Sequence, residues 1–180
     1  LWLSKVLMRK NASQNTKQKI VLGIVILTTF ILTYGGVGAV LCVFVAYPVL
    51  LPLFKEADIP RRFAVAAMCA GSLGLGNVAP GAPVVPNEVC VKALGTTSTA
   101  GAIPGFVALL IEFIFMIWAL NAMVNKSKKN GLHYEDPADI PTVDDSVKRP
   151  NALISFIPLL VVLILYAGLK WNVVTSLCIG

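Results

Sequence analysis

The chain has 180 residues, of which 57% are hydrophobic and only 13% are charged, and its formal net charge is +6. Soluble domains are about half apolar and a quarter charged, so this composition excludes a water-soluble globular protein and indicates an all-α integral membrane protein. The positive charge does not indicate nucleic-acid binding, because every Lys and Arg except Lys92 and Lys170 lies in residues 1–19, 55–62 or 125–150. Basic residues at the ends of apolar runs follow the positive-inside rule, so all three segments are predicted to be cytoplasmic.

After the basic segment 1–19, residues 20–54 contain no charged residue. This run is too long for one crossing of about 20 residues, and basic segments flank it on both sides, so a helical hairpin that enters and returns is predicted. Its tip is placed at residues 33–38 (TYGGVG), where three glycines relax the backbone. An arm over residues 20–33 reaches about 21 Å, short of a hydrocarbon core of about 30 Å, so the tip is expected inside the membrane.

After the cytoplasmic turn at 55–62, residues 63–100 are predicted to form a broken transmembrane helix. Residues 77–87 (NVAPGAPVVPN) hold three prolines, which remove backbone donors and prevent a continuous helix. Irregular backbone at membrane depth is tolerated only inside the protein or along a wet cavity. The preceding run GSLGLG, at 71–76, predicts close packing of helices through small residues.

The rest of the chain is predicted as a transmembrane helix at 101–124, a cytoplasmic loop at 125–150, a transmembrane helix at 151–170 and the start of a further segment at 171–180. The chain is expected to be a fragment of a longer protein. Its four cysteines are scattered singly in apolar segments, so no disulfide or metal site is predicted. The phosphate-binding loop pattern of ATP-driven proteins is absent from the sequence, and no enzyme activity or cofactor is expected.

The two interruptions supply the candidate substrate- and ion-binding residues. Discontinuous helices form the sites of many secondary transporters, because half-helix N-termini attract anions and freed carbonyl groups coordinate cations. We expect the amides of Gly35, Gly36 and Gly81 to face such a ligand. The full set of candidates is Thr33, Tyr34, Gly35, Gly36, Asn77, Pro80, Gly81, Pro83 and Asn87.

Two carboxylic acids in the apolar part of the chain are candidates for proton coupling, since an ionised carboxylate is costly in a membrane. Glu88 directly follows the break, and Glu112 lies midway along the helix predicted at 101–124. We favour Glu88 for its position, with a local ion pair to Lys92 as the structural alternative. For Glu112 the alternative is a neutral carboxyl group held by a hydrogen bond between helices. His133 is predicted to be a solvated loop side chain.

Several motifs taken together resemble the gluconate permease family of proton-coupled organic-anion symporters. In chain order they are TYGGV, Tyr47-Pro48, LFKEADIPRR, APGAP followed by Asn87, and GTT at 95–97, and the likeness covers about residues 20–125. The resemblance implies an inverted-repeat secondary transporter in a bacterial cytoplasmic (inner) membrane. Each repeat would hold a re-entrant hairpin and a discontinuous helix, and this chain would carry the binding elements of one repeat.

The same resemblance implies secondary active transport of a small organic anion, such as gluconate or a related sugar acid or hydroxycarboxylate, by proton symport and alternating access. Its partners would be this anion and the lipid bilayer, with a homo-oligomer left open. Val84, Val85 and Pro86 offer fewer donors than the family pattern, so a smaller or less hydroxylated carboxylate is an alternative. Sodium coupling through the carbonyl groups of the break and a non-transporting membrane bundle are further alternatives.

Overall fold

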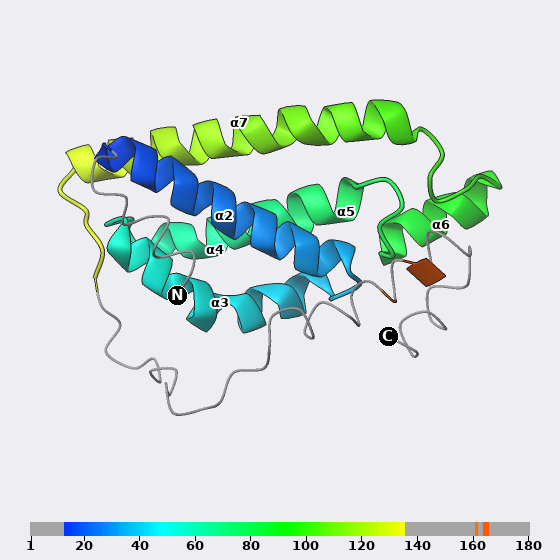
Figure 1. Ribbon diagram of the computed structural model, residues 1–180, viewed down its shortest axis with the longest axis horizontal. Helices are drawn as coiled ribbons and strands as arrows, with labels where there is room; N and C mark the ends of the chain where they lie inside the picture. Colours follow the sequence, from blue (N-terminus) through cyan, green and yellow to red (C-terminus); the bar gives the residue numbers. More distant parts are fainter. Residues whose placement is uncertain (1–12, 136–160, 162–163, 166–180) are drawn as a thin grey trace.

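A computed structural model describes residues 13–135, 161 and 164–165 of the chain. The segments 1–12, 136–150 and 171–180 lie outside the described residues, and so does nearly all of the helix predicted at 151–170. Within residues 13–135 every regular element is helical (Figure 1). The elements are α2 (Gln14–Tyr34), α3 (Ala39–Glu56), α4 (Arg62–Cys69), a π-helix (Ala70–Leu75), α5 (Gly76–Val78), α6 (Val85–Leu94) and α7 (Ala102–Lys129).

The helices run back and forth between two ends of an elongated bundle (Figure 1). Helix α2 runs to the end where the chain turns at 35–38, and α3 returns from it. Helix α4, the π-helix and α5 follow each other without a gap and form one segment, Arg62–Val78, which we call the composite helix. It leads back to the first end, where α6 lies, and α7 then returns alongside α2. We call this end the break end and the opposite one the basic end.

Three of these helices, α2, α3 and α7, are each long and apolar enough to cross a membrane. The buried core lies between α2, α3 and the composite helix, with Leu22, Ile26, Phe54 and Met68 among its fully buried side chains. Helix α7 buries side chains only near its C-terminus, and most of its large apolar residues are exposed. A long apolar helix with an exposed apolar surface is typical of a protein surrounded by lipid or by further membrane helices.

Glycines allow the composite helix to approach its neighbours closely. A Cβ atom at Gly71 would lie 2.1 Å from Thr29 Oγ1 and 2.2 Å from the carbonyl oxygen of Ile26, and one at Gly76 would lie 2.6 Å from Thr33 Cγ2. No side chain fits at such distances, so these backbones meet only because glycine lacks a Cβ atom. The close packing predicted from GSLGLG is confirmed.

The expectation of a short first arm in the hairpin is wrong, because α2 begins at Gln14 and includes Lys17 and Lys19. Its 21 residues span about 31 Å, which matches the hydrocarbon core of about 30 Å. Helix length therefore gives no reason to place the turn at 35–38 inside the membrane. Helix α7 likewise continues to Lys129, past the end expected at 124, because its lysines extend the helix instead of ending it.

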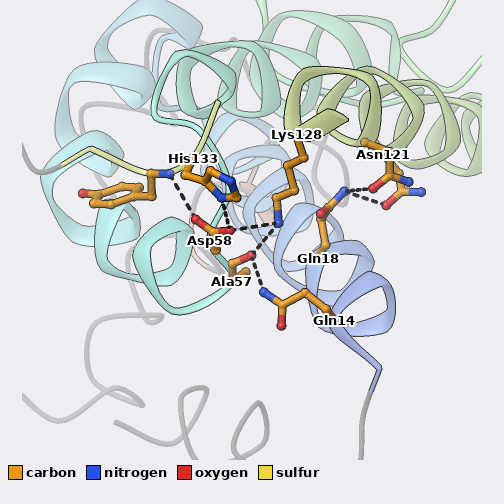
Figure 2. Close-up of polar contacts among 9 residues, drawn as sticks. Gln14, Gln18, Ala57, Asp58, Asn121, Lys128 and His133 are labelled. Carbon is orange, nitrogen blue, oxygen red and sulfur yellow. Dashed lines mark hydrogen bonds and ion pairs between the residues drawn. The ribbon is translucent and has the colours of Figure 1, made fainter. Parts of the chain in front are cut away.

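At the basic end, the turn between α3 and α4 is fixed by Asp58, whose backbone has a positive φ of 49° (Figure 2). Its carboxylate accepts a hydrogen bond from the Tyr134 amide at 3.1 Å and lies 2.8 Å from His133 Nδ1 and 3.7 Å from Lys128 Nζ. Partial burial works to raise the pKa of Asp58, but the hydrogen bonds from His133 and Tyr134 and the Lys128 charge outweigh it and lower this pKa. His133 is 62% exposed, yet it is part of this contact.

A second polar contact at the basic end joins α2 to α7. The buried amide of Gln18 donates to the side-chain oxygens of Asn121 at 3.0 Å and Asn125 at 3.1 Å (Figure 2). Arg62, at the start of the composite helix, donates to Ser127 Oγ at 2.6 Å. Polar groups buried among apolar helices need such partners, so these bonds set the register of α7 against the bundle.

Candidate functional site

The two interruptions predicted from the sequence lie against each other at the break end. The composite helix ends at Val78, and α6 begins at Val85. We call the non-helical residues 79–84 between them the break. The Tyr34 hydroxyl, at the end of α2, donates a hydrogen bond to the Pro80 carbonyl oxygen at 3.0 Å. This bond connects the first interruption to the second across 46 positions of the sequence.

The prolines and one glycine account for the path of the break. Ala79 has extended backbone angles (φ −64°, ψ 131°), and Gly81 has a φ of +76°, which favours glycine. The Gly81 amide donates to the Ser98 carbonyl oxygen at 2.8 Å, so the loop between α6 and α7 closes over the break. A Cβ atom at Gly105 would lie 2.4 Å from Pro80 Cγ, which means that the first turn of α7 packs directly against the break.

Asn87 holds the break in shape from within. Its side-chain Nδ2 donates to the carbonyl oxygens of Ala79 at 3.1 Å and Ala82 at 3.2 Å. Buried carbonyl groups in an irregular segment need such donors, since an unmet one costs about 1–3 kcal/mol. The structure thus gives Asn87 a role in forming the break.

The backbone amides expected to face a ligand are engaged within the protein. Gly35 and Gly36 donate to the carbonyl oxygens of Ile31 at 2.9 Å and Thr33 at 3.0 Å, and they close the C-terminal turn of α2. Gly81 donates to Ser98, as described above. The expectation that these three amides are free donors is therefore wrong for this conformation, and any ligand donors at the site have to come from other groups.

Two side chains at the break end have unused hydrogen-bonding capacity. The Thr33 hydroxyl is fully buried and makes no hydrogen bond of ordinary geometry to any described residue, although the thiol of Cys42 lies beside it. Asn77 is half-buried in the last helical turn before the break, and its side chain makes no hydrogen bond within the described part of the chain. Pro83 is buried in the break, and Pro80 is half-buried. Thr33 and Asn77 are thus the two predicted site residues whose side chains keep unused hydrogen-bonding capacity in the described part of the chain.

The two candidate carboxylic acids lie in different surroundings. Glu88 Oε2 is 4.0 Å from Lys92 Nζ on the same exposed helix, so the local ion pair weighed for it is present. Glu112 is half-buried on α7, and its Oε1 would lie 3.4 Å from a Cβ atom at Gly74 of the π-helix. Within residues 13–135 no hydrogen bond to Glu112 is formed, so the interhelical bond considered as its alternative is not found there.

Sequence reasoning missed the proximity of Glu112 to Gly74. A signal for it does exist, because both residues lie at similar distances from basic helix ends. Gly74 follows Arg62 by about 18 Å of helix, and Glu112 precedes Lys126 by about 21 Å. Two antiparallel helices with their basic ends aligned bring these positions to the same depth.

The fold and the interruptions define an all-helical membrane protein with several helices able to cross the bilayer. Among curated proteins, a Bacillus subtilis (strain 168) protein described as "Uncharacterized transporter YxjC" is 25% identical over 148 residues. The match covers 77% of this chain but 31% of that relative, so the chain spans about a third of the relative's length. No family model matches, and no solved structure matches significantly. The chain is thus distantly similar to a transporter, without a family assignment.

Proposed function

We propose that this chain forms part of a secondary active transporter that carries a small organic anion by proton symport. The observation that carries the proposal is the hydrogen bond from Tyr34 to the Pro80 carbonyl, which joins two interruptions of apolar helices. Non-helical backbone at membrane depth is expensive and typically marks the binding region of a transporter. The distant similarity to a protein named as a transporter supports the same class.

The depth of the break indicates the side from which a ligand would reach it. The composite helix rises about 24 Å from Arg62 to its end at Val78, just before Pro80, and Gly105, which packs on Pro80, precedes Lys126 by about 32 Å. If the basic end lies at the cytoplasmic surface, the break lies near the opposite edge of a hydrocarbon core of about 30 Å. In this proposal the site is approached from the outer side, and alternating access opens it toward the basic end.

The donors at the break favour a small carboxylate over a polyhydroxy acid. Thr33 and Asn77 offer one hydroxyl group and one amide, whereas Val84 and Val85, at the end of the break and the start of α6, offer no side-chain donor. The first turn of α6 adds the partial positive charge of a helix N-terminus. A hydroxycarboxylate of a few carbon atoms fits this set better than gluconate.

The re-entrant hairpin and the inverted repeat are part of the proposal. The turn at 35–38 would stay within the membrane of the whole protein, and a second set of interruptions would lie in sequence outside this chain. Solvent accessibility of a single cysteine at Gly36 from each side of the membrane, with and without anion, measures the first point. Rapid labelling of Gly36→Cys from the side opposite the basic end only, unaffected by anion, would contradict it.

The transport proposal is tested with the whole protein reconstituted in liposomes. Uptake of labelled gluconate and of a short hydroxycarboxylate is measured under a proton gradient, under a sodium gradient at fixed pH, and under no gradient. We expect proton-driven accumulation of the shorter acid, reduced in Thr33→Val and Asn77→Ala and retained in the surface control Val89→Ala. Accumulation driven by sodium alone would overturn proton coupling, and no accumulation of either acid would favour a non-transporting membrane bundle.

A further inference from the structure

The surroundings of Glu112 single it out among the acidic residues of the described chain. We infer that Glu112 is the group that takes up and releases the coupling proton, and that the π-helix facing it transmits this change to the break. The inference rests on the proposed proton symport and names the residue and the moving element that this activity needs. The sequence favours Glu88 because it directly follows the break, and the inference reverses that preference.

The contact between α7 and the π-helix is built around one missing side chain. A Cβ atom at Gly74 would lie 2.5 Å from Met116 Cε and 3.4 Å from Glu112 Oε1. Glu112 and Met116 are one turn apart on α7, so both point at the composite helix and lie on either side of Gly74. The glycine therefore leaves room for the Met116 side chain, and the Glu112 carboxyl group lies within contact distance of the same position.

Among residues 13–135, the helices that pack on this part of α7 offer Glu112 no counter-charge. These are α2 and the composite helix. Lys19 and Arg62 are their nearest charged residues, and both lie at the basic end. The remaining titratable groups on these helices are the Cys69 thiol, which is uncharged in its ordinary form, and the Tyr34 hydroxyl, which is bonded to the break. An unpaired carboxylate charge at membrane depth is costly, so the access of water or a cation to this position changes the cost of that charge.

Glu88 lacks these properties. It lies in the first turn of α6 and is half-buried like Glu112, with a side chain 18% exposed, but its carboxylate lies 4.0 Å from Lys92 Nζ, whose side chain is 74% exposed. The Lys92 charge offsets that of Glu88 whichever way a transporter faces. Glu112, in contrast, is located where a change in access to water changes the stability of its charge.

The π-helix offers a means of coupling Glu112 to the break. A π-helix carries one extra residue per turn relative to an α-helix, and such segments are rare and concentrate at functional sites. This one occupies Ala70–Leu75 and is followed, within the same continuous segment, by α5 and the break. From Gly74 to Ala79 the helix rises only about 7 Å. A shift at Gly74 on protonation of Glu112 is therefore passed directly to the backbone that Tyr34 holds.

The first test compares Glu112→Gln with Glu88→Gln in proteoliposomes of the whole protein. One pH unit can drive about tenfold accumulation at one proton per anion, because about 1.4 kcal/mol corresponds to a factor of ten. We expect Glu112→Gln to lose this accumulation while it retains exchange of labelled for unlabelled anion, and Glu88→Gln to accumulate like the unmodified protein. Accumulation by Glu112→Gln at the unmodified level would overturn the inference and leave the proposed function standing. Failure of the unmodified protein to accumulate any anion would overturn the proposed function itself.

A second measurement needs no transport and no variant. Dicyclohexylcarbodiimide reacts with protonated carboxyl groups in apolar surroundings, and mass spectrometry locates the modified residue. In the unmodified whole protein we expect Glu112 to be labelled at acidic pH and protected at alkaline pH, with Glu88 unlabelled throughout. Absence of label on Glu112 at every pH, or equal labelling of both residues, would contradict the assignment.

Discussion

The contact of Gly71 with α2 gives the most direct test of the fold. In Gly71→Ala the added Cβ atom would lie 2.2 Å from the carbonyl oxygen of Ile26, which is 1.2 Å short of the ordinary 3.4 Å contact. The Thr29 side chain can rotate away, but a backbone carbonyl within a helix cannot. Relief therefore requires α2 and the composite helix to separate, and this also loosens the contact between Gly76 and Thr33 farther along.

The magnitude follows from two opposing effects. Overpacking of a core costs about 1–3 kcal/mol, and a clash with backbone belongs at the upper end of this range. Replacing glycine by alanine within a helix favours folding by up to about 1 kcal/mol. The net destabilisation of about 2 kcal/mol corresponds to a fall in melting temperature of about 4–8 °C for a chain of this size.

The assay is thermal unfolding of the purified protein in detergent, with Gly23→Ala as the matched control. Gly23 also lies within a helix, but a Cβ atom there would only touch Ile117 Cδ1 at 3.4 Å. The control gains the same helix propensity without a clash, so its melting temperature should equal or exceed that of the unmodified protein. If Gly71→Ala has the same melting temperature as Gly23→Ala, the close approach of α2 to the composite helix is refuted.

Three further predictions concern the polar contacts. Tyr34→Phe removes the bond to the break, which should lower the unfolding free energy by about 1 kcal/mol and slow anion uptake; unchanged melting and uptake would contradict a linking role. Asn87→Asp replaces a double donor by an acceptor that faces two carbonyl oxygens, so it should destabilise the protein by about 1–3 kcal/mol at neutral pH. Destabilisation no greater than that caused by Val89→Ala would argue against a structural role of Asn87 in the break. Because the folded-state pKa of Asp58 is lowered, its stabilisation should be present above about pH 4 and lost as the pH falls through that lower value. Thermal unfolding at neutral and acidic pH checks this, since Asp58→Asn should lack that part of the pH dependence, and an identical pH profile for the variant would refute it.

The sequence carries enough information for the helical membrane class and the position of the break. Pro80 and Pro83, with Gly81 between them, disfavour an α-helix, and the chain is interrupted between Val78 and Val85, although Pro48 and Pro52 are accommodated within α3. The start of α2 could not be predicted from charge, because Lys17 and Lys19 continue the helix beyond the apolar run and can extend to the aqueous surface.

The composition does not reveal which hydrogen bonds the break uses. Asn87 could be taken as a ligand-binding residue, but its partners are Ala79 and Ala82 of its own segment. The ranking of the two acids depends in the same way on neighbours distant in sequence. Glu112 lies close to Gly74 of the composite helix. A single sequence does not show that these two residues are neighbours.

The π-helix also sets the direction in which the break faces. Each residue of an α-helix turns the chain by about 100°. One extra residue in the π-helix therefore rotates α5 and the break by about that angle relative to the buried face of α4. Converting Ala70–Leu75 to regular α-helix would therefore turn the Pro80 carbonyl away from Tyr34 while the start of the composite helix stayed in place. The π-helix thus fixes the angle at which the break faces Tyr34.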